Sequence, residues 1–228
     1  MAQSSTTLVI STGAGIGAAV AERMRDRGDH VVATDPDLDL TDADAVGAAL
    51  AAVVAPGSVD LVVIAALDPS AFEAAPIVSL DEQRWDRAAE RPVRAAFVVL
   101  QQVHAVIADG GRVVLVLPTV AATGVAELVP LCTAVEAIRV MAKAVARRWG
   151  ARSITVNTIE IELRAFILGD RDDDDSAVPI VPVLGQPALP PGRAVDDVVG
   201  LVDMLASPSA GAITGALLVA DRGTVMQP

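Results

Sequence analysis

Short runs of branched apolar residues alternate along the chain with longer stretches in which apolar residues recur at helical spacing. The short runs predict strands over residues 7–10, 30–34, 38–40, 59–65, 112–117, 153–159 and 216–220. The longer stretches predict helices over residues 18–27, 43–54, 79–108, 131–149 and 195–206. This alternation favours an α/β fold, with a single Rossmann-like domain over residues 1–228 and a doubly wound parallel sheet covered by helices on both faces.

Local signals refine several of these boundaries. Thr41 is expected to cap the helix over 43–54, and Ser79 and Glu82 have the spacing of a capping box for the helix over 79–108. Pro92 lies inside that second helix and lacks a backbone N–H, so we expect a break or kink there. Residues 160–192 are rich in proline and acidic side chains and predict a mobile surface loop with a short helical piece.

Charge and composition argue against several classes of protein. The net charge of −12 disfavours a nucleic-acid or anionic-membrane partner, because both need a basic surface. No apolar run has membrane-spanning length, the first residues lack a signal-peptide pattern, and Cys132 is the only cysteine, so we expect a cytoplasmic protein. No group of residues has metal-ligand spacing, and the acidic run at 172–175 is more typical of a solvated loop than of a cation site.

The first predicted strand runs into a glycine-rich turn, Thr12-Gly-Ala-Gly-Ile-Gly17. A strand, a glycine turn, a helix, a strand and the acid Asp35 follow one another in the order of a dinucleotide-binding unit. Glycine allows close approach to a pyrophosphate, and Asp35 can accept a hydrogen bond from a ribose 2′-hydroxyl, which favours NAD. The alternative is a tight turn kept for packing, with Asp35 as a solvated strand end and no cofactor. Both alternatives stay open.

Further segments along the chain resemble one family in their order and spacing. They are Asp39-Leu-Thr-Asp42, Val59-Asp-Leu-Val-Val63, Trp85-Asp-Arg87, Ile154-Thr-Val-Asn157 and Ile213-Thr-Gly215. Over its whole length the chain resembles the short-chain dehydrogenase/reductase family. The resemblance implies that a nicotinamide dinucleotide is bound through Thr12, Gly13, Gly15, Ile16, Gly17, Asp35 and Asp39. The glycine turn is, however, two residues shorter than the family's turn.

The departures from the family fall on its catalytic residues. Leu131 and Val135 stand where the resemblance places Tyr and Lys, and the chain has no tyrosine. The family's helix Asn corresponds to Pro92, and its Ser corresponds to Pro118 by spacing or to Thr119 by the local pattern. In the family the Tyr transfers the proton that accompanies hydride transfer, and the Lys lowers the pKa of the Tyr. Leucine and valine can do neither.

The two longest predicted helices, 79–108 and 131–149, are apolar nearly all round, which is typical of helices buried on both sides. In the family these helices form the main dimer interface. We therefore expect a non-catalytic subunit that pairs with an active family member in a heteromeric, tetrameric oxidoreductase of bacterial acyl-thioester or ketone metabolism, or a homo-oligomer built through the same helices. One alternative is an isomerase, dehydratase or cyclase that reuses the pocket through Thr119, Glu160 or Glu162. Another is a conventional NAD-dependent oxidoreductase.

Overall fold

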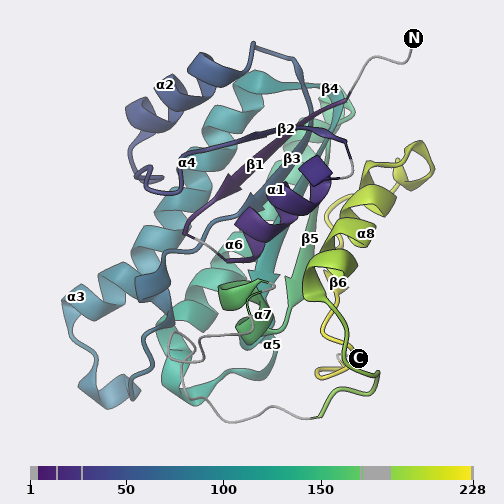
Figure 1. Cartoon of the computed structure of the whole chain (residues 1–228). Coiled ribbons are helices and arrows are strands. Elements are labelled where there is room, and N and C mark those ends of the chain that lie inside the picture. The colour runs from purple at the N-terminus through teal and green to yellow at the C-terminus, as the bar shows by residue number, and fades with distance from the viewer. Residues whose placement is uncertain (1–4, 14, 27, 170, 172–185, 227–228) are drawn as a thin grey trace.

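A parallel sheet forms the centre of the molecule (Figure 1). The computed structural model describes residues 5–13, 15–26, 28–169, 171 and 186–226. The strands in this part of the chain are β1 (Thr6–Ser11), β2 (His30–Ala33), β3 (Val59–Ala65), β4 (Ile107–Pro118), β5 (Thr155–Ile161) and β6 (Leu217–Val219). They lie in the order β2-β1-β3-β4-β5-β6, and all neighbouring pairs are parallel. The predicted α/β class is therefore confirmed.

Helices cover both faces of the sheet, as Figure 1 shows. They are α1 (Ile16–Asp26), α2 (Ala43–Val53), α3 (Glu82–Trp85), α4 (Arg91–Val106), α5 (Val120–Thr123), α6 (Val129–Trp149), α7 (Leu163–Leu168) and α8 (Ala194–Ala206). Helices α1 and α8 pack together on one face, whereas α2, α4 and α6 pack in sequence on the other. Because both faces are covered, the central strands are continuous apolar runs in which Val62, Val63 and Val114 are fully buried.

The predicted strand over 38–40 and the predicted cap at Thr41 are both wrong. Aspartate side chains take up the backbone N–H groups of this segment: Asp35 Oδ1 accepts from Asp37 N at 2.9 Å, and Asp39 Oδ1 accepts from Thr41 N at 2.9 Å. Asp42, not Thr41, caps α2 by accepting from the N–H groups of Asp44 and Ala45. Local side-chain bonds of this kind compete with a sheet ladder and favour turns.

The predicted helix over 79–108 is divided by a π-helical turn that ends two residues before the proline. Helix α3 is followed by a π-helical turn at Asp86–Glu90, and α4 then begins at Arg91 with Pro92 in its first turn. The wider π-helical turn, in which Arg91 N donates to Asp86 O, comes directly before Pro92, which has no N–H to donate. The proposed capping box is wrong, because Asp81 caps α3 by accepting from Arg84 N at 2.8 Å.

The predicted loop over 160–192 is wrong at its start. Strand β5 continues to Ile161, and α7 follows almost directly as the expected short helical piece. The acidic run at 172–175 lies outside the described residues. The side chain of Asn157, within β5, holds the segment before β6: its amide donates to Ile213 O at 2.9 Å, and its oxygen accepts from Ala216 N at 3.1 Å.

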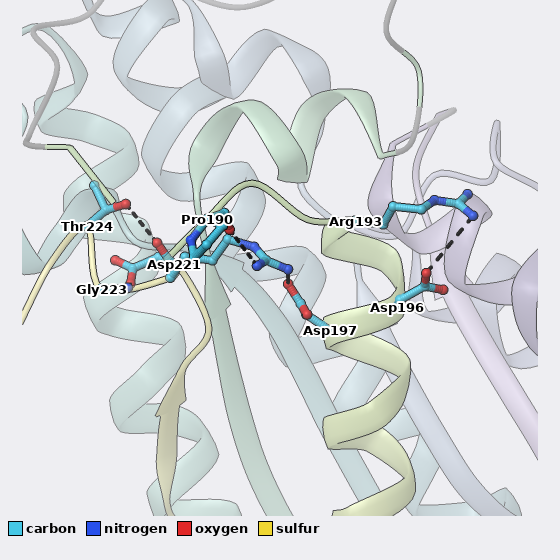
Figure 2. Close-up of polar contacts among 8 residues, drawn as sticks. Pro190, Arg193, Asp196, Asp197, Asp221, Gly223 and Thr224 are labelled. Atoms are coloured by element: carbon cyan, nitrogen blue, oxygen red, sulfur yellow. Dashed lines mark hydrogen bonds and ion pairs between the residues drawn. The ribbon is translucent and has the colours of Figure 1, made fainter. Parts of the chain in front are cut away.

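A turn after β6 ties the C-terminal part of the chain to α8, and Figure 2 shows its contacts. Asp221 accepts from Gly223 N at 3.0 Å, and the Thr224 hydroxyl donates to Asp221 O at 2.7 Å. Arg222 has a φ of 58°, a left-handed conformation that costs a non-glycine residue on the order of 1 kcal/mol. Its guanidinium donates to Pro190 O at 2.9 Å and pairs with Asp197 of α8, which offsets that cost.

Candidate functional site

A cleft lies at the carboxyl ends of β1, β2 and β3. Within the sheet, β2 lies on one flank of β1 and β3 lies on the other. The strand order therefore reverses at β1. Open α/β sheets bind ligands in the crevice at such a switch point. The cavity is about 360 Å³ and is lined by Thr12, Gly13, Pro36, Asp37, Leu38, Asp39, Leu40, Thr41, Ala66, Asp68, Pro69, Arg91, Pro92 and Ala95.

The charged lining of this cleft is mainly acidic. Asp37, Asp39 and Asp68 stand against a single cation, Arg91, whose guanidinium lies 3.6 Å from the Asp39 carboxylate. Hydrogen bonds from the Thr41 hydroxyl and backbone N–H, with a smaller effect of Arg91, lower the pKa of Asp39 below its usual value. Three acids and one arginine make an unfavourable environment for a phosphate and suit hydroxyl-rich groups better.

The predicted cofactor residues divide into two groups. Thr12, Gly13 and Asp39 line the cleft, and the Thr12 hydroxyl donates to Leu67 O at 2.7 Å. Gly15, Ile16, Gly17 and Asp35 do not line it. Ile16 is buried in the core. A Cβ built on Gly17 would lie 2.5 Å from Ser11 Cβ, so glycine is needed there for close packing of α1 on the sheet.

The phosphate end of a dinucleotide does not fit the glycine turn as it stands. A pyrophosphate would lie at the start of α1, against the backbone of Gly15. A Cβ built on Gly15 would lie 2.6 Å from the carbonyl oxygen of Phe166 and 3.0 Å from that of Ile167. The C-terminal end of α7 therefore already occupies the space beside Gly15. The nucleoside end of the cleft has no comparable obstruction among the described residues.

The five positions that the resemblance assigns to catalysis lie beside one another in the fold. Helix α6, which carries Leu131 and Val135, contacts β4, α5 and the π-helical turn before Pro92. Leu131 and Val135 are both 0% exposed, and Pro92, Pro118 and Thr119 are also buried. Only Thr119 offers a hydrogen-bonding side chain. Its backbone N–H donates to Ile161 O at 2.8 Å.

Glu160 is the most perturbed acid in the described part of the chain. It is 0% exposed on β5, and its Oε1 lies 3.4 Å from Arg139 Nε on α6. Arg139 also pairs with Glu136. Burial raises the pKa of Glu160 to about 7; Arg139 opposes the rise, and Glu136 and Asp221 add to it. Neither carboxylate oxygen has a hydrogen-bond partner among the described residues.

The other candidate groups have structural partners. Glu162 is exposed and caps α7 by accepting from Ala165 N at 3.0 Å. Cys132 is partly buried, its thiol donates to Val120 O at 3.3 Å, and burial raises its pKa. The described residues contain no group of three or more His, Cys, Asp or Glu side chains that could hold a metal ion. No helix among them is long and apolar enough to cross a membrane.

Sequence reasoning did not assign most of the cleft lining to a site, including Arg91 and Asp68, and it did not place α7 beside Gly15. Arg91 and Asp68 line the cavity, and Asp68 caps the short helical turn Pro69–Phe72 by accepting from Ser70 N at 2.8 Å. Asp68-Pro69-Ser70 is a recognisable capping sequence, so that turn could have been found. The position of α7 could not, because it depends on contacts with residues about 150 positions earlier in the chain.

Comparison with known proteins finds relatives that align with nearly the whole chain. A family model described as enoyl-(acyl carrier protein) reductase matches residues 36–225. D-threitol dehydrogenase from Mycolicibacterium smegmatis is 28% identical, over 95% of this chain and 91% of that protein. The 3-oxoacyl-(acyl-carrier-protein) reductase MabA from Mycobacterium tuberculosis is 26% identical, over 98% of this chain and 94% of that protein.

The solved structures agree with this assignment. A short-chain dehydrogenase/reductase from Serratia marcescens superimposes with a TM-score of 0.73 at 25% identity, over 97% of this chain and 98% of that one. The family model covers most of the sequence, and the relatives align over nearly all of it. The parallel sheet, its switch-point cleft and these matches together show that the chain belongs to the short-chain dehydrogenase/reductase family.

Proposed function

We infer that this chain is a non-catalytic member of its family that serves as a subunit of a heteromeric oxidoreductase, paired with an active short-chain dehydrogenase/reductase. The observation that carries the proposal is the pair Leu131 and Val135 on α6. They stand where the resemblance places the proton donor and its lysine, both are fully buried, and the chain has no tyrosine. Neither side chain can donate or accept a proton.

The surface of α4 and α6 supports the pairing. A groove of about 490 Å³ runs between these helices, and Phe97, Met141 and Val145 are among the residues that line it. Phe97 is 55% exposed, and Val140 on α6 is 61% exposed. Exposed large apolar side chains beside a groove of this kind are typical of protein–protein interfaces. The proposed partner is an active relative that presents the same two helices, and the proposed setting is acyl-thioester or ketone metabolism.

The isolated chain is expected to leave NADH absorbance unchanged with ketones and 3-oxoacyl thioesters. Loss of a positioned proton donor lowers rates roughly 100- to 10,000-fold, even where the cofactor binds. The control is the D-threitol dehydrogenase relative, assayed with D-threitol and either nicotinamide dinucleotide. Steady turnover of a carbonyl substrate by the purified chain, at a rate comparable with this control, would contradict the proposal.

Assembly is expected to depend on the groove between α4 and α6. Phe97→Glu places a charge in that groove and should weaken association at least about tenfold, whether the partner is an active relative or a second copy. Val53→Glu, at an apolar position on α2 that is 50% exposed, is the matched control and should leave assembly unchanged. Native mass spectrometry of the chain co-expressed with an intact relative measures both. A wild-type chain that stays monomeric in this experiment would contradict the proposal.

The second candidate is a conventional oxidoreductase. It is favoured by the names of the relatives, which are a dehydrogenase and a reductase, and the same turnover assay separates it from the first proposal. A repurposed isomerase, dehydratase or cyclase has less support. Thr119, Glu160 and Glu162 do not line the switch-point cleft, and the Glu162 carboxylate caps α7.

A further inference from the structure

Helix α7 is fixed against the glycine turn by contacts on two sides. Gly169, directly after the helix, has a φ of +62°, and a Cβ built there would lie 3.1 Å from Ala19 Cβ and 3.2 Å from Gly15 O. Phe166 is buried and meets the ring of Phe72 edge to face, with the ring centroids 5.9 Å apart. These contacts hold the carbonyl oxygens of Phe166 and Ile167 beside Gly15.

The polar groups at the end of α7 are also bonded in this arrangement. The Arg171 guanidinium donates to Leu168 O at 3.2 Å and to Ile167 O at 3.5 Å. Glu162 caps the other end of the helix. A helix that is capped at both ends and anchored by a buried aromatic ring has a stable docked position. The carbonyl oxygen of Phe166 stands beside Gly15, where a phosphate would need hydrogen-bond donors.

The part of the cleft that α7 leaves open suits a nucleoside. Its volume of about 360 Å³ is near the lower end of ligand pockets, which span roughly 300–1,000 Å³. Leu38, Leu40 and Ala95 offer apolar surface for a base, and Asp37 and Asp39 offer carboxylates for ribose hydroxyls. The three acids in the lining add a second obstacle to phosphates.

We propose that α7 closes the phosphate end of this cleft, so that the chain binds an adenine nucleoside but gains nothing from the phosphates and nicotinamide of the whole dinucleotide. The proposal goes beyond the subunit role and does not depend on it. It also accounts for the shortened glycine turn. A turn that no longer wraps a pyrophosphate leaves space that a segment of the same chain fills.

The test is a titration of the full-length chain with adenosine, ADP-ribose and NAD⁺. Calorimetry measures the affinities, and amide NMR shifts locate the site. The dissociation constant of adenosine should be no more than about threefold above those of ADP-ribose and NAD⁺. Adenosine should also shift the amide signals of residues 38–41. NAD⁺ or ADP-ribose binding more than about threefold tighter than adenosine would overturn the proposal. An absence of adenosine binding at millimolar concentration would also overturn it. Tighter NAD⁺ binding without turnover would leave the subunit role standing.

Variants of α7 test the closure directly. Phe166→Ala removes the contact with Phe72 and should tighten NAD⁺ binding about tenfold, with adenosine affinity unchanged. Phe72→Leu removes the same ring contact from the other side and serves if the first variant does not fold; it should tighten NAD⁺ binding about threefold. Arg147→Ala, at an exposed position of α6, is the control and should change neither affinity. A folded Phe166→Ala or Phe72→Leu variant with unchanged NAD⁺ affinity would refute closure by α7.

Discussion

Restoring the family's catalytic pair by the double substitution Leu131→Tyr and Val135→Lys should strongly destabilise the protein without creating activity. Both positions are 0% exposed. An unpaired ammonium in the core costs on the order of 4 kcal/mol, and overpacking by the tyrosine ring adds about 1–3 kcal/mol. Denaturant unfolding measures the loss of stability, and NADH oxidation measures the activity. Leu131 and Val135 belong to the buried apolar core, so the two polar groups would replace packed apolar side chains.

Two single substitutions on the same helix separate the cost of burying a charge from the cost of changing the side chain itself. Val140→Lys makes the same change as Val135→Lys at a side chain that is 61% exposed, and it should alter the unfolding free energy by less than about 0.5 kcal/mol. Leu131→Met keeps the volume nearly constant and should cost less than about 1.5 kcal/mol. A double variant as stable as the wild type would show that the pocket has room for the catalytic pair and would weaken the subunit proposal.

Glu160→Gln is expected to stabilise the protein at pH 8 by about 3 kcal/mol and to have little effect near pH 4.5. Burial raises the pKa of this carboxyl from 4.5 to about 7, so the folded state binds more protons than the unfolded state between these values. The contribution of Glu160 to stability is therefore complete below about pH 4.5 and is lost as the pH rises through 7. Glutamine stays neutral throughout. Urea unfolding of both proteins from pH 4.5 to 8 measures the difference.

Glu136→Gln is the control for this experiment. Glu136 is the other partner of Arg139, but its side chain is 50% exposed, so its removal should change stability by less than about 1 kcal/mol at every pH. Arg139 and Glu136 face Glu160 from α6, and Asp221 faces it from the turn after β6. A difference between wild type and Glu160→Gln that stays constant across the pH range would show that the carboxyl does not titrate as described.

The fold could be predicted where burial alone decides the structure. The predicted strand over 59–65 has the bounds of β3, because all of its residues except Asp60 are apolar and buried in a sheet covered on both faces. The predicted strand over 38–40 failed because three aspartates bond their own backbone. The π-helical turn at Asp86–Glu90 was missed because it leaves the hydrophobic pattern almost unchanged and shifts the facing of later residues.

The site was less predictable than the fold because its main features depend on contacts between distant segments. Leu131 and Val135 could be placed by their order along one helix, and in the structure both are buried. The burial of Glu160 against Arg139 depends on the packing of β5 on α6, which strand alternation does not specify. The position of α7 over Gly15 likewise leaves no local signal in either segment.

The shortness of β6 has a consequence for how the sheet opens. This last strand has three residues paired with β5 from Thr158 to Glu160, and it lies at the edge of the sheet, so β5 is the only strand that it has to leave. Val219, directly opposite Glu160, is already 37% exposed. Departure of the strand admits water to the carboxylate of Glu160, and an ionised carboxylate gains free energy from that hydration. At alkaline pH we therefore expect β6 to separate from β5 before the other strands separate, because water then stabilises the ionised carboxylate of Glu160.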